Sequence, residues 1–258
     1  MRLRLPAILR AILPAVFLAG QCAGAQADPI QVSIKNDQTS AVHISFTNST
    51  QSAGIVSWNA DGCTKPTTTA HASSVTIKPG KTCVATVDSS NGSSRFCASS
   101  KSAPANCWEA QTNHQTLIET NFLPASDGGC FGQGSCVWYD ISVIPSACTD
   151  ELWKQDECAN TGGASYNLPV SLSCAGNASM PTYVCQGPRN QTYGPAKYPS
   201  HCGNPNATCA VGTTQNGKPC TDGVSTYFYP MFVPPENAWQ PNAVCLKGSL
   251  AIEFLAGK

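Results

Sequence analysis

The sequence predicts an all-β protein, and three of its features support this. Short runs of alternating apolar and polar residues recur along the chain, no long amphipathic helix is evident, and 21 Gly and 19 Pro supply turns. Charged residues make up only 12% of the 258 residues, and cysteines number 15. This composition is typical of compact secreted β proteins whose loops are held by disulfides. We therefore expect a β-sandwich core with a disulfide-rich loop lobe at about 174–220.

The first 27 residues are expected to be a secretory signal peptide. They carry three arginines, an apolar run over 11–20, and small residues at Ala25 and Ala27. The apolar run is too short to cross a bilayer, which disfavours the alternative of a transmembrane segment. We expect a secreted mature chain, 28–258, that forms one domain, does not insert stably into membranes and is a monomer.

Charge and cysteine usage exclude several classes of function. Removing the signal peptide takes away three of the 15 basic residues and none of the 15 acidic ones, which leaves a net charge of −3 and argues against nucleic acid as a partner. Fourteen cysteines remain, an even number that predicts seven structural disulfides in an oxidising compartment. No CxxC pair occurs and the four histidines are scattered, so neither a metal nor a cofactor is expected.

The first third of the mature chain alternates in short runs. Apolar residues at every second position over 30–34 and 42–46, with a turn-rich stretch between them, predict a β-hairpin with one buried face. The Ser-, Thr- and Ala-rich segment 48–80 predicts exposed strands and turns, and Pro79–Gly80 marks a turn before a strand at 84–87. Residues 89–115 are interpreted as a polar loop.

Two further runs, 116–122 and 137–144, each carry a carboxylate in mid-strand. They flank a loop closed by Cys130 and Cys136. Because side chains alternate along a strand, Glu119 and Asp140 are expected side by side on one face of the sheet. The pair is either a functional acidic site or a solvated polar face.

The remaining chain predicts few regular elements. Residues 145–165 are the most helix-like piece, and 166–173 return to strand alternation. From Cys174 to Cys220 the composition shifts to Gly, Pro, Asn and Cys, which indicates the loop lobe without a second core. A last strand is expected at 250–254.

Several of these segments resemble the thaumatin-like proteins, the family of secreted pathogenesis-related and sweet proteins. Thr-Leu-Ile-Glu at 116–119 and Trp-Tyr-Asp-Ile-Ser-Val-Ile at 138–144 are similar to two strands of that family. Tyr-Asn-Leu-Pro-Val at 166–170 and Cys220-Thr-Asp222 followed by Tyr-Phe-Tyr at 227–229 resemble two further motifs in the right order. The resemblance implies a divergent member of the family with its β-sandwich fold and an acidic cleft that acts on cell-wall β-1,3-glucan.

The sequence also departs from the family pattern. The family joins its first hairpin to its last strand by a disulfide, whereas here Asp37 and Leu255 occupy those places. The family's cleft has an arginine, a glutamate and three aspartates, and the resemblance assigns Glu119, Asp140 and Asp222 to three of these roles. Pro145 stands where another aspartate is expected, and the nearest arginine before Thr116 is Arg95, beyond a disulfide loop. The cleft is therefore expected to be only partly retained, unless the 145–165 insertion supplies a substitute acid.

Three functions remain open at this point. Glu119 and Asp140 suit glycoside hydrolysis as proton donor and as base or nucleophile, which makes the protein an endo-β-1,3-glucanase. A glycan-binding protein without turnover would use the same face, with Trp138 and Tyr166 stacking on sugar rings. A non-catalytic defence or structural protein, or an enzyme inhibitor, would act through its surface loops.

Short-range pairing is predicted for most of the disulfides. The predicted pairs are Cys97 with Cys107, Cys130 with Cys136, Cys148 with Cys158 and Cys202 with Cys209, and Cys174 or Cys185 with Cys220 and Cys245.

Overall fold

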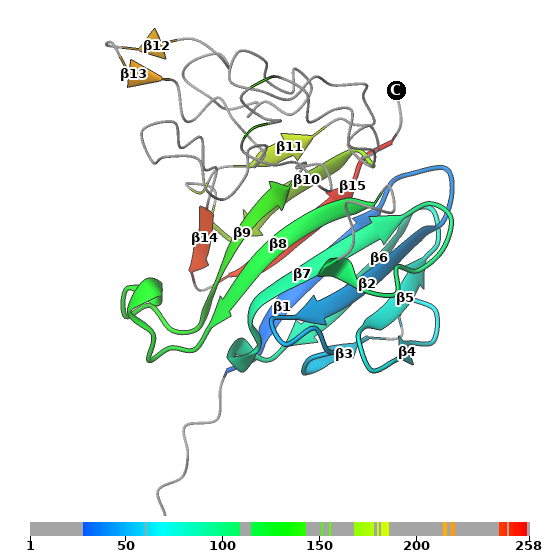
Figure 1. Cartoon of the computed structure of the whole chain (residues 1–258), viewed down its shortest axis with the longest axis horizontal. Coiled ribbons are helices and arrows are strands. Elements are labelled where there is room, and N and C mark those ends of the chain that lie inside the picture. Colours follow the sequence, from blue (N-terminus) through cyan, green and yellow to red (C-terminus); the bar gives the residue numbers. More distant parts are fainter. Residues whose placement is uncertain are drawn as a thin grey trace, which may run out of the picture.

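The chain forms a two-layer all-β sandwich (Figure 1). This architecture comes from a computed structural model. It describes residues 28–59, 61–108, 115–142, 168–177, 182–185, 243–246 and 248–256, with 151, 155, 180, 214–215 and 218–219.

The first layer is a six-stranded sheet in which the N-terminal strand pairs in parallel with the last strand of the chain. Its strands, in spatial order, are β11 (Tyr183–Cys185), β10 (Val170–Ala175), β15 (Ser249–Phe254), β1 (Ile30–Asn36), β6 (Lys81–Val87) and β3 (Val56–Trp58).

The second layer is a seven-stranded antiparallel sheet. Its strands, in spatial order, are β14 (Ala243–Leu246), β9 (Cys136–Ser142), β8 (Thr116–Leu123), β7 (Gly92–Ser99), β2 (Val42–Asn48), β5 (Ser73–Ile77) and β4 (Thr67–Thr68). A separate two-stranded ladder joins β12 (Thr214–Gln215) to β13 (Lys218–Pro219), and the short 3₁₀ turns η1 (Ser89–Asn91) and η3 (Gly128–Cys130) lie in connections.

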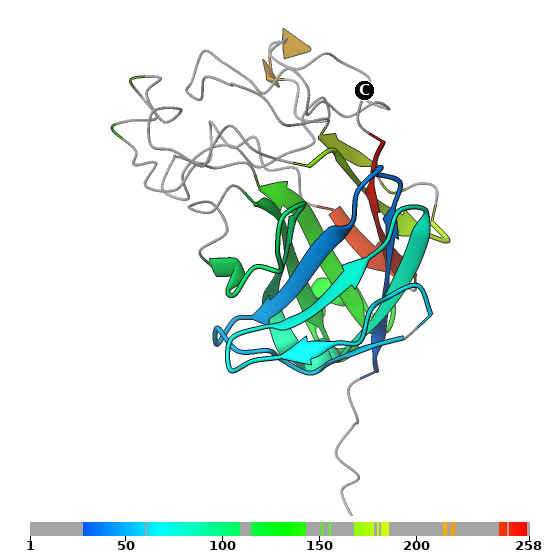
Figure 2. The ribbon, with the colours of Figure 1, turned by 90° about the vertical axis from the view of Figure 1, so that its right-hand side faces the viewer.

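The hydrophobic core is formed by buried side chains of both sheets, and Figure 2 shows the strands of the sandwich turned by 90°. Alternation along β1 turns Ile30, Val32 and Ile34 inward, and their exposed fractions are 5%, 0% and 0%. From the other sheet, Phe46 and Phe96 meet at a ring-centroid distance of 4.9 Å, within the range of favourable tilted aromatic contacts. The period-two apolar pattern therefore fixes which face of each strand is buried.

The predicted hairpin over 30–46 is wrong. β1 pairs with β6 and β15, whereas β2 pairs with β5 and β7 in the opposite sheet. Both runs have one apolar face, and those faces meet across the core instead of lying side by side. Alternation predicts a buried face but does not distinguish strands paired in one sheet from strands packed across two sheets.

The polar loop predicted over 89–115 is also wrong in part, because Gly92–Ser99 forms β7 in the middle of the seven-stranded sheet. Ser94, Phe96 and Ala98 face the core at 2%, 1% and 1% exposure. The small and polar residues of this strand conceal its alternation, and burial of Phe96 and Ala98 decides its place.

The hairpin of β8 and β9 is confirmed, and its register pairs Glu119 with Asp140. Turns and strands predicted around Pro79–Gly80 and at the C-terminus are confirmed as well, the latter as β15. The helix-like segment 145–165 lies outside the described residues apart from 151 and 155, as do the signal peptide and most of the 174–220 lobe.

Disulfides close short connections and also link the two sheets. Cys97–Cys107 and Cys130–Cys136 are paired as predicted, and Cys174–Cys245 links β10 to β14 across the two sheets. Cys63–Cys83 adds a further pair, and Cys185 is also disulfide-bonded. The predicted pairs of Cys148 with Cys158 and of Cys202 with Cys209, and the partner role of Cys220, fall outside the described residues.

Asp37 and Leu255 occupy the two positions that a disulfide joins in the thaumatin-like family. In this chain, hydrogen bonds join the two segments instead. The Asp37 amide donates to the Phe254 carbonyl over 2.8 Å, and the Gln38 side-chain amide donates to the Leu255 carbonyl. The two strand ends are thus adjacent and joined without cysteine. Within the described part of the chain, no helix is long and apolar enough to cross a membrane.

Candidate functional site

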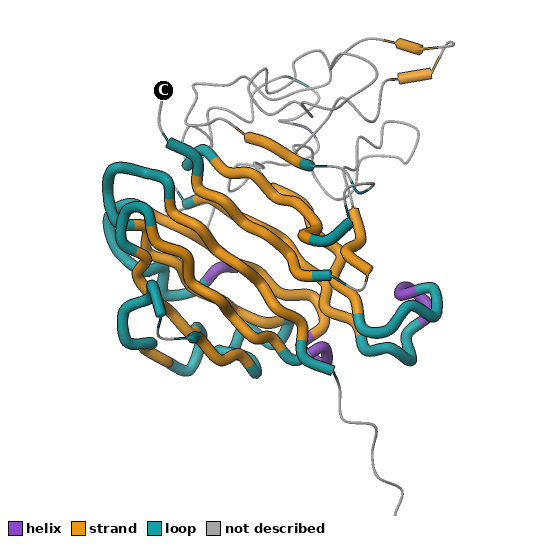
Figure 3. Tube along the Cα trace, turned by 180° about the vertical axis from the view of Figure 1, so that it is seen from behind, coloured by secondary structure: helices purple, strands orange, loops and turns teal. Residues whose placement is uncertain are grey.

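The candidate site is a row of three charged side chains across neighbouring strands of the seven-stranded sheet. Arg95 of β7 lies opposite Glu119 of β8, and Glu119 lies opposite Asp140 of β9. All three belong to the parity that faces away from the core. We call Arg95, Glu119 and Asp140 the acidic row, and the side of the sheet that carries them the outer face. The strands that bear it, β7, β8 and β9, run side by side in Figure 1, and Figure 3 shows the sandwich from behind.

Arg95 and Glu119 form a direct ion pair. The Arg95 guanidinium donates from Nη2 to Oε1 of Glu119 over 2.6 Å, and the side chains are 17% and 26% exposed. The Trp108 ring lies against the guanidinium, with Cζ of Arg95 3.9 Å from the ring centroid. This cation–π contact and the partial burial hold the ion pair more firmly than a fully solvated pair would be held.

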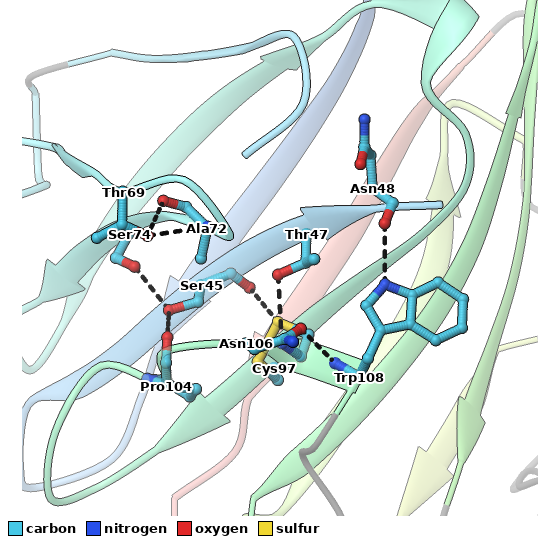
Figure 4. Close-up of a disulfide and its surroundings, with 11 residues drawn as sticks. Ser45, Thr47, Asn48, Thr69, Ala72, Ser74, Cys97, Pro104, Asn106 and Trp108 are labelled. Carbon is cyan, nitrogen blue, oxygen red and sulfur yellow. Dashed lines mark hydrogen bonds between the residues drawn. A yellow bond between two sulfur atoms is a disulfide. The ribbon is translucent and has the colours of Figure 1, made fainter. Parts of the chain in front are cut away.

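A disulfide-closed loop places Trp108. The Cys107 amide donates to Oγ1 of Thr47 over 3.2 Å, and the Trp108 indole N–H donates to the Asn48 carbonyl over 2.9 Å (Figure 4). Ser45 anchors the same loop by donating its hydroxyl to the Pro104 carbonyl. The segment that follows β7 therefore folds back over β2 and presents its tryptophan to Arg95.

Asp140 is in a different electrostatic state from its neighbour. Its Oδ1 atom is buried and has no hydrogen-bond partner among the described residues. Burial raises the pKa of the Asp140 carboxyl well above its usual value, and the Glu119 carboxylate raises it further, while Arg95 lowers it by a smaller amount. A carboxyl group whose burial favours the protonated form therefore lies directly beside an ion-paired carboxylate.

Two other polar atoms near the acidic row lack partners. The Ser142 hydroxyl, two residues along β9 from Asp140, and the Gln115 side-chain carbonyl, directly before β8, are both buried without a hydrogen bond in the described structure. Buried polar groups are normally hydrogen-bonded, because leaving one unpaired costs about 1–3 kcal/mol. Together with Asp140, these buried atoms leave hydrogen-bonding capacity that buried water can fill.

Trp138 lies on the outer face two residues from Asp140, opposite Asn121. Its indole N–H donates to the Gly129 carbonyl over 3.2 Å, and its ring lies 6.3 Å from the Phe131 ring, centroid to centroid. The residue is half-buried, so part of the ring stays accessible. Trp138 is thus fixed against the turn between β8 and β9.

The structure brings together only some of the residues predicted for the site. Glu119, Asp140 and Trp138 share the outer face of one hairpin. Asp222, Tyr166 and Pro145 lie outside the described residues, as does the 145–165 insertion except for 151 and 155. Among the described residues, no group of three or more His, Cys, Asp and Glu side chains is placed to hold a metal ion.

The expectation that no arginine is at hand is corrected. Arg95 reaches Glu119 because 92–99 forms a strand, and the Cys97–Cys107 loop projects from that strand without separating it from β8. Trp108 was also missed. The sequence signal for the strand that carries Arg95 is the alternation of Ser94, Phe96 and Ala98 with Arg95 and Cys97.

Comparison with known proteins assigns no family to this chain. No known family model matches the sequence, and no curated protein matches it either. Among solved structures, the chain is similar to the protein elicitor MoHrip2 from Magnaporthe oryzae, with 12% identity and a TM-score of 0.38, over 88% of this chain and 99% of that chain. A likeness of this size assigns neither a family nor an activity.

Proposed function

We propose that the protein binds a cell-wall polysaccharide of the β-1,3-glucan type on the outer face and hydrolyses it with Glu119 and Asp140. The direct pairing of these two carboxyl groups in unlike environments carries the proposal. Carboxyl groups with separated protonation states are the usual acid and base of one reaction centre. The accessible part of Trp138 suits the apolar face of a sugar ring.

The chemistry divides between the two acids. The neutral Asp140 carboxyl donates its proton to the glycosidic oxygen, so that the C1–O bond breaks and the leaving sugar departs as an alcohol. The Glu119 carboxylate, oriented by Arg95 over 2.6 Å, attacks C1 and forms a glycosyl ester. Water then attacks C1, gives its proton to Asp140 and frees Glu119.

The separation of the two carboxyl groups decides the stereochemical outcome of hydrolysis. Side chains directly opposite each other on antiparallel strands have Cβ atoms about 4.5–5.5 Å apart. Retaining glycosidases separate their carboxyl groups by about 5–5.5 Å, and inverting enzymes by about 6.5–9.5 Å. Carboxyl groups that lie as close as these Cβ atoms would retain the configuration of the cleaved bond, and NMR of the newly released reducing end tests this.

The test combines retention on insoluble β-1,3-glucan with release of reducing sugar. Wild type should be retained and should release sugar, and Glu119→Gln and Asp140→Asn should each lower release at least a hundredfold while remaining bound. Glu253→Gln is the matched control, because Glu253 is also an acid ion-paired across strands, to Lys35, on the other sheet. Its release should equal that of wild type.

Binding without turnover is the second candidate, and the half-buried Trp138 beside Asn121 supports it independently of the acids. Retention of wild type without sugar release would select this candidate and reject hydrolysis. Failure of wild type to bind or cleave the glucan would reject the polysaccharide function. The proposal would then pass to a defence or structural protein, or an enzyme inhibitor, that acts through its loops.

The same proposal includes the cellular setting. The disulfides of the sandwich suit an oxidising compartment, which supports secretion, and the order of the thaumatin-like motifs supports a distant relation to that family. A monomeric extracellular protein in contact with cell walls fits both.

A further inference from the structure

The turn between β8 and β9 exposes an aromatic side chain on a rigid support. Phe131 is 62% exposed, and Ile55 is the other large apolar residue with a similar exposure in the described structure, at 63%. The turn is closed by Cys130–Cys136, and Asp127 caps it by accepting a hydrogen bond from the Gly129 amide over 2.8 Å. Phe131 is therefore held in place although its ring faces solvent.

The backbone at Phe131 is unfavourable for this residue type. Its φ of 51° and ψ of 33° are left-handed, a conformation that costs a residue with a Cβ about 1 kcal/mol. Gly132 and Gly134 occupy the other left-handed positions of the turn, with φ of 69° and 91°. The turn thus uses glycine at two such positions and a large exposed aromatic residue at the third.

The Phe131 ring continues the line of the candidate site. It lies 6.3 Å from the Trp138 ring, and Trp138 is two residues along β9 from Asp140, or about 7 Å. The orientation of the Trp138 indole is fixed by its hydrogen bond to the Gly129 carbonyl. Position 129 is also tightly packed, because the Cβ of an alanine there would stand 2.8 Å from Cδ1 of Leu123. Acids and aromatic rings therefore form one track along the hairpin, on the order of 13 Å long.

We propose that Phe131 and Trp138 form a sugar-stacking subsite that holds a pyranose ring of the glucan beyond the bond at the acidic row. This inference rests on the proposed polysaccharide function. Sugar rings carry apolar C–H faces that pack on aromatic rings, and a preformed support lowers the entropic cost of binding. A chain that reaches both the acids and Phe131 spans several sugar units, which makes the site specific for oligomers and polymers over single sugars.

Titration calorimetry with β-1,3-gluco-oligosaccharides of two and of six units tests the subsite in a Glu119→Gln background, in which the ligands are bound without being cleaved, and Glu119→Gln alone is the wild-type reference. Phe131→Ala should weaken binding of the six-unit ligand about tenfold, because it removes partial burial of one aromatic ring. Phe131→Tyr should bind the six-unit ligand like wild type. Phe131→Leu should show most of the loss expected for Phe131→Ala, because it keeps apolar bulk but has no ring face. Binding of the two-unit ligand at the acids should change less than twofold in all three variants.

Ile55→Ala is the matched control, since it removes an equally exposed apolar side chain elsewhere and should leave both affinities unchanged. Thermal unfolding of each variant should match wild type, because neither side chain is buried. The inference is overturned if Phe131→Ala binds the six-unit ligand as tightly as wild type does, or if Phe131→Leu does. It is also overturned if Phe131→Ala instead abolishes binding to phosphatidylcholine vesicles and leaves glucan binding intact.

The experiment separates this inference from the proposed function. Equal affinity of wild type and Phe131→Ala for the six-unit ligand overturns the subsite and leaves the proposal for the acidic row intact. Wild type that binds neither oligosaccharide overturns both.

Discussion

Two outer faces of the sandwich carry the same set of charges in unlike settings. On the six-stranded sheet, Lys35 lies opposite Glu253 and contacts both Glu253 and Asp37, over 2.8 and 2.7 Å. On the seven-stranded sheet, Arg95 likewise accompanies two acidic side chains, yet among the described residues its ion pair is with Glu119.

The difference lies in pairing and burial. The hydrogen bond from Lys35 lowers the pKa of the Asp37 carboxyl, and the side chains of Lys35, Asp37 and Glu253 are 47%, 31% and 38% exposed. Burial raises the pKa of Asp140, and its Oδ1 has no partner among the described residues. The first set is a solvated surface network. The second set holds a carboxyl group whose charged form is disfavoured by burial, a feature that clusters at functional sites.

The largest expected effect separates the two cations. Arg95→Met should destabilise the fold by about 2–4 kcal/mol, because it leaves the partly buried Glu119 carboxylate unpaired beside Asp140. Denaturant unfolding at neutral pH measures this loss. Lys35→Met is the control, and its unfolding midpoint should stay near that of wild type since both of its partners remain solvated. Equal midpoints for the two variants would remove the distinction between the faces.

The next prediction concerns pH. The pKa of Asp140 is raised on folding, so the stability linked to it is fully present below its unfolded value of 3.8 and is lost as the pH rises through the folded pKa. Asp140→Asn should remove this loss and be more stable than wild type at pH 7, the two curves diverging by at most about 1.4 kcal/mol per pH unit.

Asp37→Asn should have the opposite effect on the pH dependence of the free energy of unfolding. The pKa of Asp37 is lowered on folding, so its stabilisation is present above its unfolded value of 3.8 and disappears as the pH falls through the folded pKa. Unfolding of wild type and both variants at several pH values from 2 to 7 shows the two slopes. Parallel curves for wild type and Asp140→Asn would contradict the assigned state of Asp140.

A smaller effect is expected at Trp108. Trp108→Leu removes the ring that lies 3.9 Å from the Arg95 guanidinium and the indole hydrogen bond to Asn48, and should cost about 1–2 kcal/mol. The loss should shrink in an Arg95→Met background, because the cation–π part no longer exists there. A double-mutant cycle measures this coupling, and a coupling of zero would show that Trp108 serves only to pack the loop.

Much of the hairpin that carries the acids is predictable from sequence, and the physical reason is local. Its strands alternate clearly, the connection over 124–135 is held by a disulfide between two nearby cysteines, and in the structure Glu119 lies opposite Asp140. The parity of Tyr139 with the buried Val137 and Ile141 follows in the same way.

Non-local pairing is where sequence reasoning fails. The strands of 30–36 and 42–48 have the pattern of a hairpin, but each finds its partners far along the chain, in β15 and β7 for example. The same cause hides Arg95, whose strand is recognisable only once β2 and β8 lie on either side of it. The charge environment of Asp140 depends on that assembly, so its raised pKa is a property of the fold and not of a motif.

The most direct test is a carboxyl-carbon NMR titration of Asp140 and Asp37, assigned with the Asn variants. The account predicts that Asp140 titrates above the ordinary value of 3.8 and Asp37 below it. An Asp140 midpoint at or below 3.8 would show an ordinary ionised carboxylate on a solvated face, and would contradict the assignment of Asp140 as the proton donor of a functional site.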